Sequence, residues 1–116
     1  MTEPVYQLVA YRDDEGREPF QIWFAGLDRH AAVKVAVILT RLEQGNLSEV
    51  EPVGLGVLER RIDWGPGYRV YFGRDGARLL ILLGGGTKKR QQRDIAAAQE
   101  RWANYKARRK DEEAGL

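Results

Sequence analysis

Apolar residues in the first third of the chain recur at the spacing of an α-helix. Pro19 is followed at i, i+3, i+4 and i+7 by Phe20, Trp23, Phe24 and Leu27. This spacing predicts a short helix with one buried side, and proline suits its first turn. Asp28 is a favourable N-cap for a second helix, which should stop at Gly45-Asn46. The buried side of this second helix should carry Ala32, Val35, Ile38, Leu39 and Leu42.

Shorter segments have the composition and alternation of β-strands. We expect strands over residues 5–11, 57–63, 68–73 and 77–84, with a loop over residues 47–56. Asp75-Gly76 predicts a tight hairpin between the last two strands. Residues 79–83 are apolar without alternation, which indicates a central strand covered on both faces.

A last helix is predicted from Thr87 or Lys88 to Lys110, with an apolar stripe of Ile95, Ala98, Trp102 and Tyr105. The element order is therefore β-α-α-β-β-β-α. It predicts an α+β fold: a four-stranded, mainly antiparallel sheet with an N-terminal helical hairpin and a C-terminal helix. The length of 116 residues suits one domain, which we place at residues 1–110. Residues 111–116 are expected to form a frayed acidic tail.

The predicted hairpin of residues 57–73 has one face that is not apolar. Because side chains alternate along a strand, Glu59 and Arg61 share a face with Arg69 and Tyr71 once the apolar residues point into the core. We expect this to be the outer face, with Arg61 opposite Arg69 or Tyr71. Two arginines so close need an anion between them, either Glu59 or an external phosphate. A solvated Glu–Arg pair is the alternative interpretation.

Charge is distributed unevenly along the chain. Residues 1–56 hold five Lys and Arg against nine Asp and Glu, a net charge of −4. Residues 57–110 hold fourteen against five, a net charge of +9. Such a basic half favours a polyanionic partner, although solvation of a helix and of sheet edges would need the same residues. The chain has no cysteine and one histidine, so neither a disulfide framework nor a histidine metal cluster is expected.

Three glycines at residues 84–86 precede Thr87 and the cations Lys88, Lys89 and Arg90. Helix N-termini favour negative charge, so three cations in a first turn break the local rule. A phosphate bound at this glycine-rich loop would relieve the conflict. Alternatively, the helix starts near Gln91 or Asp94 and leaves a basic loop.

These segments resemble the RelE/ParE superfamily of toxins, and most closely its HigB-like addiction module killer group. That group carries E-L-R-I and G-P-G-Y-R-V-Y-F strands and a G-G-D-K-x-x-Q loop before a helix with D-I. The corresponding residues here are 59–62, 65–72, 85–91 and 94–95, and RLEQGN at 41–46 also fits. Two positions depart from the pattern: Arg60 replaces leucine, and Thr87 replaces aspartate and could serve as an N-cap.

The resemblance implies a RelE-like fold and a cytoplasmic toxin of a type II toxin–antitoxin module. It implies a helix-turn-helix antitoxin from an adjacent gene, and cleavage of mRNA, often on the ribosome. No cofactor, metal or membrane is implied. The alternatives are a non-catalytic toxin, such as a ParE-like inhibitor of DNA gyrase, and an inactive remnant that only binds its antitoxin.

Metal-free RNA cleavage uses the 2′-hydroxyl as nucleophile and needs a base, an acid and cations on the phosphate. Glu59 or Tyr71 is the candidate base, and Lys88 or Tyr71 the candidate acid. Arg61 and Arg69 would clamp the phosphate. The single histidine, His30, lies at the start of a predicted helix, and we interpret it as structural or solvated. Further contacts to nucleic acid are expected from Lys89, Arg90, Arg74 and Gln91.

Overall fold

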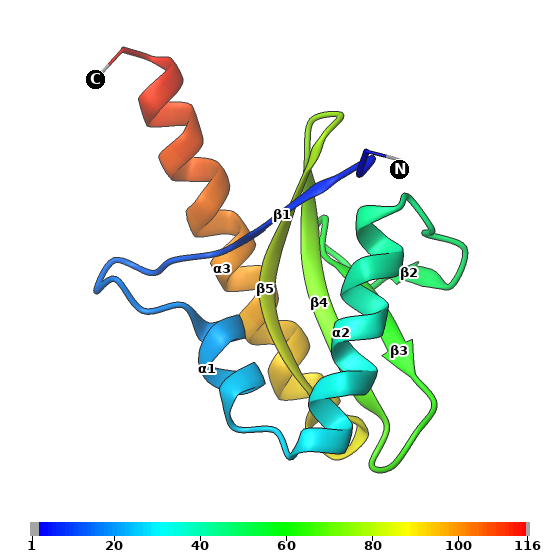
Figure 1. The fold of residues 1–116 in the computed structure, drawn as a ribbon. Coiled ribbons are helices and arrows are strands. Elements are labelled where there is room, and N and C mark those ends of the chain that lie inside the picture. The colour runs from blue at the N-terminus through cyan, green and yellow to red at the C-terminus, as the bar shows by residue number, and fades with distance from the viewer. Residues whose placement is uncertain (1–2, 116) are drawn as a thin grey trace.

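The computed structural model describes residues 3–115, which fold into one mixed sheet between two layers of helices (Figure 1). The sheet order is β1-β5-β4-β3-β2, with β1 parallel to β5 and the other neighbours antiparallel. The α+β class, the helical hairpin and the C-terminal helix are as predicted. The elements are β1 Gln7–Ala10, α1 Pro19–Ala25, α2 Arg29–Glu43, β2 Val50–Pro52, β3 Leu58–Ile62, β4 Tyr68–Asp75, β5 Leu79–Thr87, the 3₁₀ turn η1 Lys88–Arg90 and α3 Gln91–Glu113.

The sheet has five strands, and the prediction of four was wrong. The additional strand is β2, which lies within residues 47–56, the segment expected to be a loop, and pairs with β3. Its three residues end at Pro52, so it is too short to show alternation and contains a residue that disfavours strands. The interpretation of β5 was correct: it lies between β1 and β4, and Leu80, Ile81, Leu82 and Leu83 are buried.

Local signals set the ends of α1 and α2. Pro19 opens α1, and the Asp28 carboxylate accepts a hydrogen bond from the backbone N–H of Ala31 at 2.9 Å. Gly45 follows α2 with a φ of +84°, a conformation that favours glycine. The buried alanine of α2 is Ala31, whereas Ala32 is only half-buried. The remaining buried positions of α2 follow the predicted spacing.

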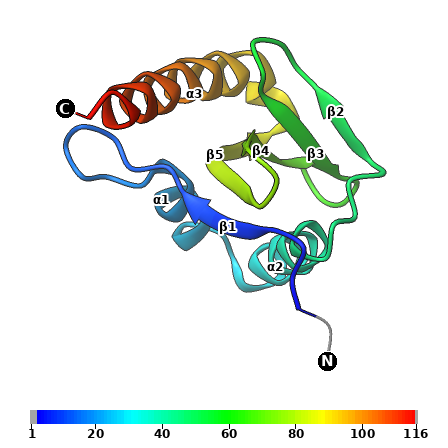
Figure 2. The same ribbon diagram turned by 90° about the horizontal axis from the view of Figure 1, so that it is seen from above.

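The helices cover both faces of the sheet. Figure 2 shows α1 and α2 on one side and α3 on the other. One core contains Phe20, Val35, Val70 and Phe72 on the α1–α2 side. A second core contains Tyr71, Leu83 and Ala98, with Trp102, on the α3 side. The hairpin face that carries Tyr71 is therefore not an outer face, because the apolar stripe of α3 packs against it.

The glycine triplet is part of strand β5, and the expectation of a glycine-rich loop was wrong. A methyl group on Gly84 would lie 2.7 Å from the Arg101 guanidinium, and one on Gly85 would lie 2.2 Å from the Trp23 ring. On Gly86 it would lie 1.9 Å from the Asp94 carboxylate. The triplet thus lets side chains of α1 and α3 pack directly on the backbone of the sheet.

The C-terminal helix differs from its predicted bounds at both ends. Lys88–Arg90 form the 3₁₀ turn η1, so α3 itself begins at Gln91, as the alternative interpretation had it. Thr87 occupies the position before η1, but its side chain makes no capping bond to a described residue. The helix continues past Lys110 to Glu113, so this part of the expected tail is helical, and Leu116 lies outside the described residues. None of the helices within residues 3–115 is long and apolar enough to cross a bilayer.

Candidate phosphate-binding site

The Glu59 carboxylate is the centre of the predicted site and is fully buried between β3, β4 and the start of α3. Its Oε1 accepts a hydrogen bond from Arg61 Nε at 3.0 Å. Its Oε2 accepts one from the Gln91 side chain at 3.0 Å and lies 3.5 Å from Arg69 Nε. Glu59 therefore draws two arginines and the first residue of α3 to one point.

Arg61 and Arg69 form a directly opposed pair across β3 and β4, one of the two predicted registers. Their environments differ sharply, because 52% of the Arg61 side chain is exposed and only 6% of the Arg69 side chain. Arg69 also donates to the backbone carbonyl of Gly67 at 3.1 Å. Arg61 can reach an external phosphate in this conformation, whereas Arg69 supports the site from beneath. The hydrogen bond and charge of Glu59 raise the pKa of Arg61.

Tyr71 is directly opposite Glu59 in the ladder and is fully buried. Its hydroxyl has no hydrogen-bond partner among residues 3–115. Burial, followed by the negative charge of Glu59, raises the pKa of Tyr71 well above its usual value. A phenol that holds its proton this firmly is a poor base. The raised pKa therefore argues against the base role of Tyr71.

The cations of η1 lie at the same end of the sheet as Arg69. The backbone N–H of Lys88 donates to the carbonyl of Pro66 in the β3–β4 turn. A methyl group on Gly67 would lie 3.3 Å from Lys88 Cβ and 3.8 Å from the Arg69 guanidinium, so these two side chains pack at the same point. Lys88, Lys89 and Arg90 are exposed. The structure thus brings Lys88 of the basic turn next to Arg69, although η1 is not the first turn of α3.

Arg74 was predicted to bind nucleic acid with this set, but it is remote from it. It pairs with Leu80 at the far end of β4, whereas Arg69 pairs with Gly86 near η1. Its guanidinium lies 5.3 Å from the centre of the Tyr6 ring. Arg74 is an even-numbered residue of β4 like Val70 and Phe72, so it belongs to the opposite face of the sheet.

Asp94 is a site residue that the sequence reasoning did not assign. One of its oxygens is buried above Gly86 without a hydrogen-bond partner in the described residues. Burial raises the pKa of Asp94, and the charges of Arg90, Arg101 and Arg93 oppose this shift. Within residues 3–115, all three buried side-chain atoms without hydrogen bonds belong to Arg69, Tyr71 and Asp94. The one available signal was the Asp-Ile pair of the quoted motif.

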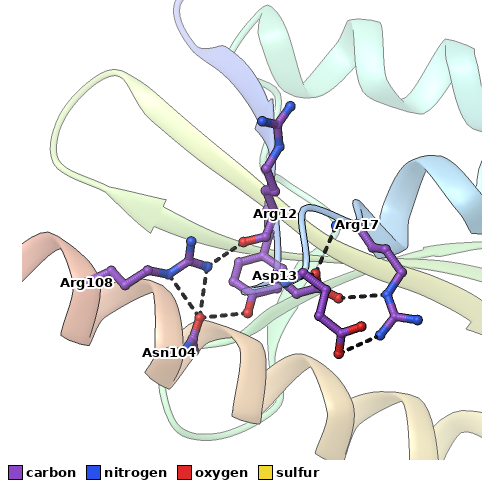
Figure 3. A network of polar contacts seen from close by, with 7 residues as sticks. Arg12, Asp13, Arg17, Asn104 and Arg108 are labelled. Carbon is purple, nitrogen blue, oxygen red and sulfur yellow. Dashed lines mark hydrogen bonds and ion pairs between the residues drawn. The ribbon is translucent and has the colours of Figure 1, made fainter.

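A separate polar network joins the β1–α1 loop to α3. Figure 3 shows Arg108 and Asn104 of α3 beside the backbone of Arg12. Asn104 accepts hydrogen bonds from Arg108 and from the Tyr11 hydroxyl, the latter at 2.8 Å. This network anchors the loop and lies away from Glu59. His30 is exposed near the start of α2, which agrees with a solvated residue.

The site can hold an anion at its exposed rim. Arg61 and Lys88 offer charge to the solvent, while the buried Glu59 holds both Arg61 and Arg69. Phosphate groups are the natural ligands of such cation clusters. The buried carboxylate partly neutralises the cluster, so an anion would compete with Glu59 for the Arg61 guanidinium.

A comparison with known proteins found a relative in Haemophilus influenzae strain Rd. It is 40% identical over 81 residues, which make up 69% of this chain and 82% of the relative. The two proteins belong to one family. The relative is described as an uncharacterized protein, so its name assigns no activity to the shared residues. No family model matches the chain.

Proposed function

We propose that this chain is the toxin of a type II toxin–antitoxin module, of the RelE/ParE superfamily and its HigB-like group. Its activity is metal-independent cleavage of mRNA on the ribosome, which arrests translation. The observation that carries this proposal is the meeting of Arg61 and Arg69 on Glu59, with Lys88 beside Arg69 at the same end of the sheet. Cations from two strands and a turn would grip the backbone of a polyanion.

The burial of each group narrows its role in this reaction. Arg61 and Lys88 bind the scissile phosphate because they are exposed, and Arg69 adds positive charge from beneath. Lys88 or Tyr71 supplies the proton to the leaving oxygen. Glu59 remains the base, and its Oε2 must exchange Gln91 for the 2′-hydroxyl of the RNA. The first turn of α3 therefore shifts when substrate binds.

A second candidate function is supported by the burial of the catalytic set. Glu59 and Tyr71 are 1% and 0% exposed, so they would have to be uncovered before they could act on RNA. A toxin that only docks on a protein, such as DNA gyrase, would need no such movement of α3. In that case the exposed cations of η1 would act as a docking surface. A substitution of Glu59 or Tyr71 that leaves the protein folded distinguishes the two candidates. It should abolish the activity of a nuclease and leave that of a docking toxin unchanged.

The proposed partners follow from the same family assignment. A helix-turn-helix antitoxin encoded by an adjacent gene would bind the folded toxin, and mRNA with the ribosome would be the target in the cytoplasm. Co-expression with the neighbouring gene should yield a stable complex and restore growth. A chain that neither arrests growth nor binds that product would instead match the inactive remnant.

The experiment is expression of the chain in bacteria, followed by two readouts. Sequencing of mRNA 5′ ends should show new cleavage sites within minutes, while plasmid supercoiling stays unchanged. Arg61→Ala should abolish these sites, whereas Arg74→Ala, at the other end of β4, should retain them. Loss of supercoiling with intact mRNA would replace the nuclease with the gyrase inhibitor.

A further inference from the structure

A groove runs along the other side of β3, between α2 and the β2–β3 edge of the sheet. Its volume is about 800 Å³, within the range of small-molecule sites. Val33 and Val37 of α2 form an apolar wall, and they are 58% and 44% exposed. Arg61 is also among the lining residues, so the groove adjoins the candidate phosphate-binding site.

Arg60 supplies a buried charge at this groove. It lies on the core face of β3, and only 10% of its side chain is exposed. The guanidinium reaches outward to the Glu49 carboxylate at 2.8 Å and donates to the backbone carbonyl of Arg61. Because Glu49 is 69% exposed, the carboxylate that neutralises Arg60 is held from the solvent side and can be exchanged for another anion.

Two further cations line the groove from α2. Lys34 and Arg41 are exposed, and neither forms an ion pair within residues 3–115. They are seven residues apart on one helix, which corresponds to about 10 Å along its axis. This spacing lets them contact separate phosphates of an extended strand. Three carboxylates also line the groove. Glu49 and Glu51 are already engaged by Arg60 and Arg61, and the exposed Asp63, which forms no ion pair within residues 3–115, adds its charge beside Arg61.

An aromatic ring closes one end of the groove. Trp64, in the β3–β4 turn, stacks on Tyr68 with the ring centres 6.1 Å apart and the planes at 23°. The Lys34 ammonium lies 5.6 Å from the centre of the Trp64 ring. A base that stacked on Trp64 would replace this ammonium and free it to contact a phosphate.

We propose that the α2–β3 groove binds single-stranded RNA next to the phosphate held at Arg61. One base stacks on Trp64, and the phosphates that flank it contact Lys34 and Arg41. The inference rests on the proposed function, since it extends the RNA path from one side of β3 to the other. Arg60 anchors the groove and adds positive charge to its floor.

The combination of groups favours a nucleotide over other occupants. A flat base has apolar faces that suit the valine wall and the tryptophan ring, and its phosphates suit the unpaired cations. A purely apolar peptide would leave Lys34 and Arg41 without partners. Inorganic phosphate alone would leave the valine wall and Trp64 unused.

The test measures binding separately from cleavage. The probe is a fluorescent single-stranded oligonucleotide with 2′-O-methyl riboses, which lacks the nucleophile and stays intact. The double variant Lys34→Ala/Arg41→Ala removes two exposed cations from the groove. Its matched control, Arg78→Ala/Lys110→Ala, removes two exposed cations elsewhere. Trp64→Leu removes the stacking surface but keeps an apolar side chain, and its thermal midpoint is measured to establish folding.

We expect the groove double variant to bind the oligonucleotide at least tenfold more weakly than wild type. The slope of its log binding constant against log salt concentration should become shallower by about 1.4, because each lost phosphate contact to a single strand removes about 0.7. Folded Trp64→Leu should lose about tenfold in affinity. Equal affinities and slopes for the groove and control doubles would overturn the groove assignment. Arg61→Ala in the same assay tests the site itself, so failure of the groove and failure of the proposed function are distinguishable.

Discussion

Arg61 and Arg69 lie opposite each other across β3 and β4, and each contacts a different oxygen of Glu59. Like charges directly opposed in a ladder are destabilising unless an anion separates them. Glu59 provides that anion inside the protein, so the pair is formed before any substrate arrives. One arginine of the pair faces the solvent and the other is sealed beneath α3. This asymmetry makes Arg61 the group that can receive an external phosphate.

Glu59→Gln should therefore destabilise the fold strongly. The change leaves the buried Arg69 guanidinium without its counter-charge, and breaking a buried ion pair costs about 3–5 kcal/mol. The control is Glu51→Gln, which removes an exposed carboxylate of the same sheet and should change stability by less than about 0.5 kcal/mol. Urea unfolding measures both. Equal stabilities for the two variants would show that Glu59 does not hold the arginine pair.

Gly73 is expected to tolerate no larger side chain. A methyl group there would lie 2.5 Å from the Trp102 ring, which packs α3 onto β4. Gly73→Ala should cost about 1–3 kcal/mol through this overpacking. Gly26→Ala is the matched change, since the nearest atom would be an ordinary 3.6 Å away. A neutral Gly73→Ala would contradict the position of Trp102 and hence the covering of the Tyr71 face.

Tyr71 should make stability depend on pH in the alkaline range. Its folded pKa is raised by burial, so above the unfolded value of 10.0 the unfolded chain loses a proton that the folded chain keeps. The stabilising contribution is complete below that pH and declines as pH rises, by about 1.4 kcal/mol per pH unit. Tyr71→Phe should remove this part of the slope.

Tyr105, whose pKa burial raises to about 12, remains in both proteins and serves as an internal reference. The measurement is the free energy of unfolding of wild type and Tyr71→Phe in steps across alkaline pH. Parallel curves would mean that Tyr71 ionises as readily in the folded protein as in the unfolded one, and its raised pKa would be refuted.

Asp94→Asn should stabilise the protein at neutral pH. The folded pKa of Asp94 lies above its unfolded value, so the folded state holds its proton more tightly and the ionised form is disfavoured. The penalty is absent at low pH and develops as pH rises through the range between the two values. An uncharged side chain of the same shape avoids it. A lower thermal midpoint for Asp94→Asn at neutral pH than for wild type would contradict this environment.

Much of the fold could be predicted because the local signals agree with the packing. The Asp28 cap, the spacing of Phe20 and Val35, and the uninterrupted apolar run in β5 each specify one element. The two permitted partners of Arg61 also followed from alternation alone. β2 could not be predicted, because three residues that end in proline carry no periodicity.

The covering of the site was missed for a different physical reason. The apolar stripe of α3 was recognised, but the place where a helix docks depends on long-range shape. Gly73 and Gly86 create the flat backbone that receives Trp102 and Asp94, and this fit is visible only in three dimensions. Glu59, Arg69 and Tyr71 therefore looked exposed from the alternation of β3 and β4. Arg74 was assigned to the site for its charge, although alternation along β4 places it on the face of Val70 and Phe72.

The most direct test of the account is the rate at which purified protein cleaves mRNA on translating ribosomes. Arg61→Ala/Lys88→Ala removes two exposed cations of the candidate phosphate-binding site, and Arg74→Ala/Arg78→Ala removes two at the far end of the β4–β5 hairpin. We expect the first variant to lose at least a hundredfold in rate and the second to match wild type. Equal rates for the two variants, or no cleavage by the folded wild type, would contradict the claim that Arg61 and Lys88 grip the RNA backbone.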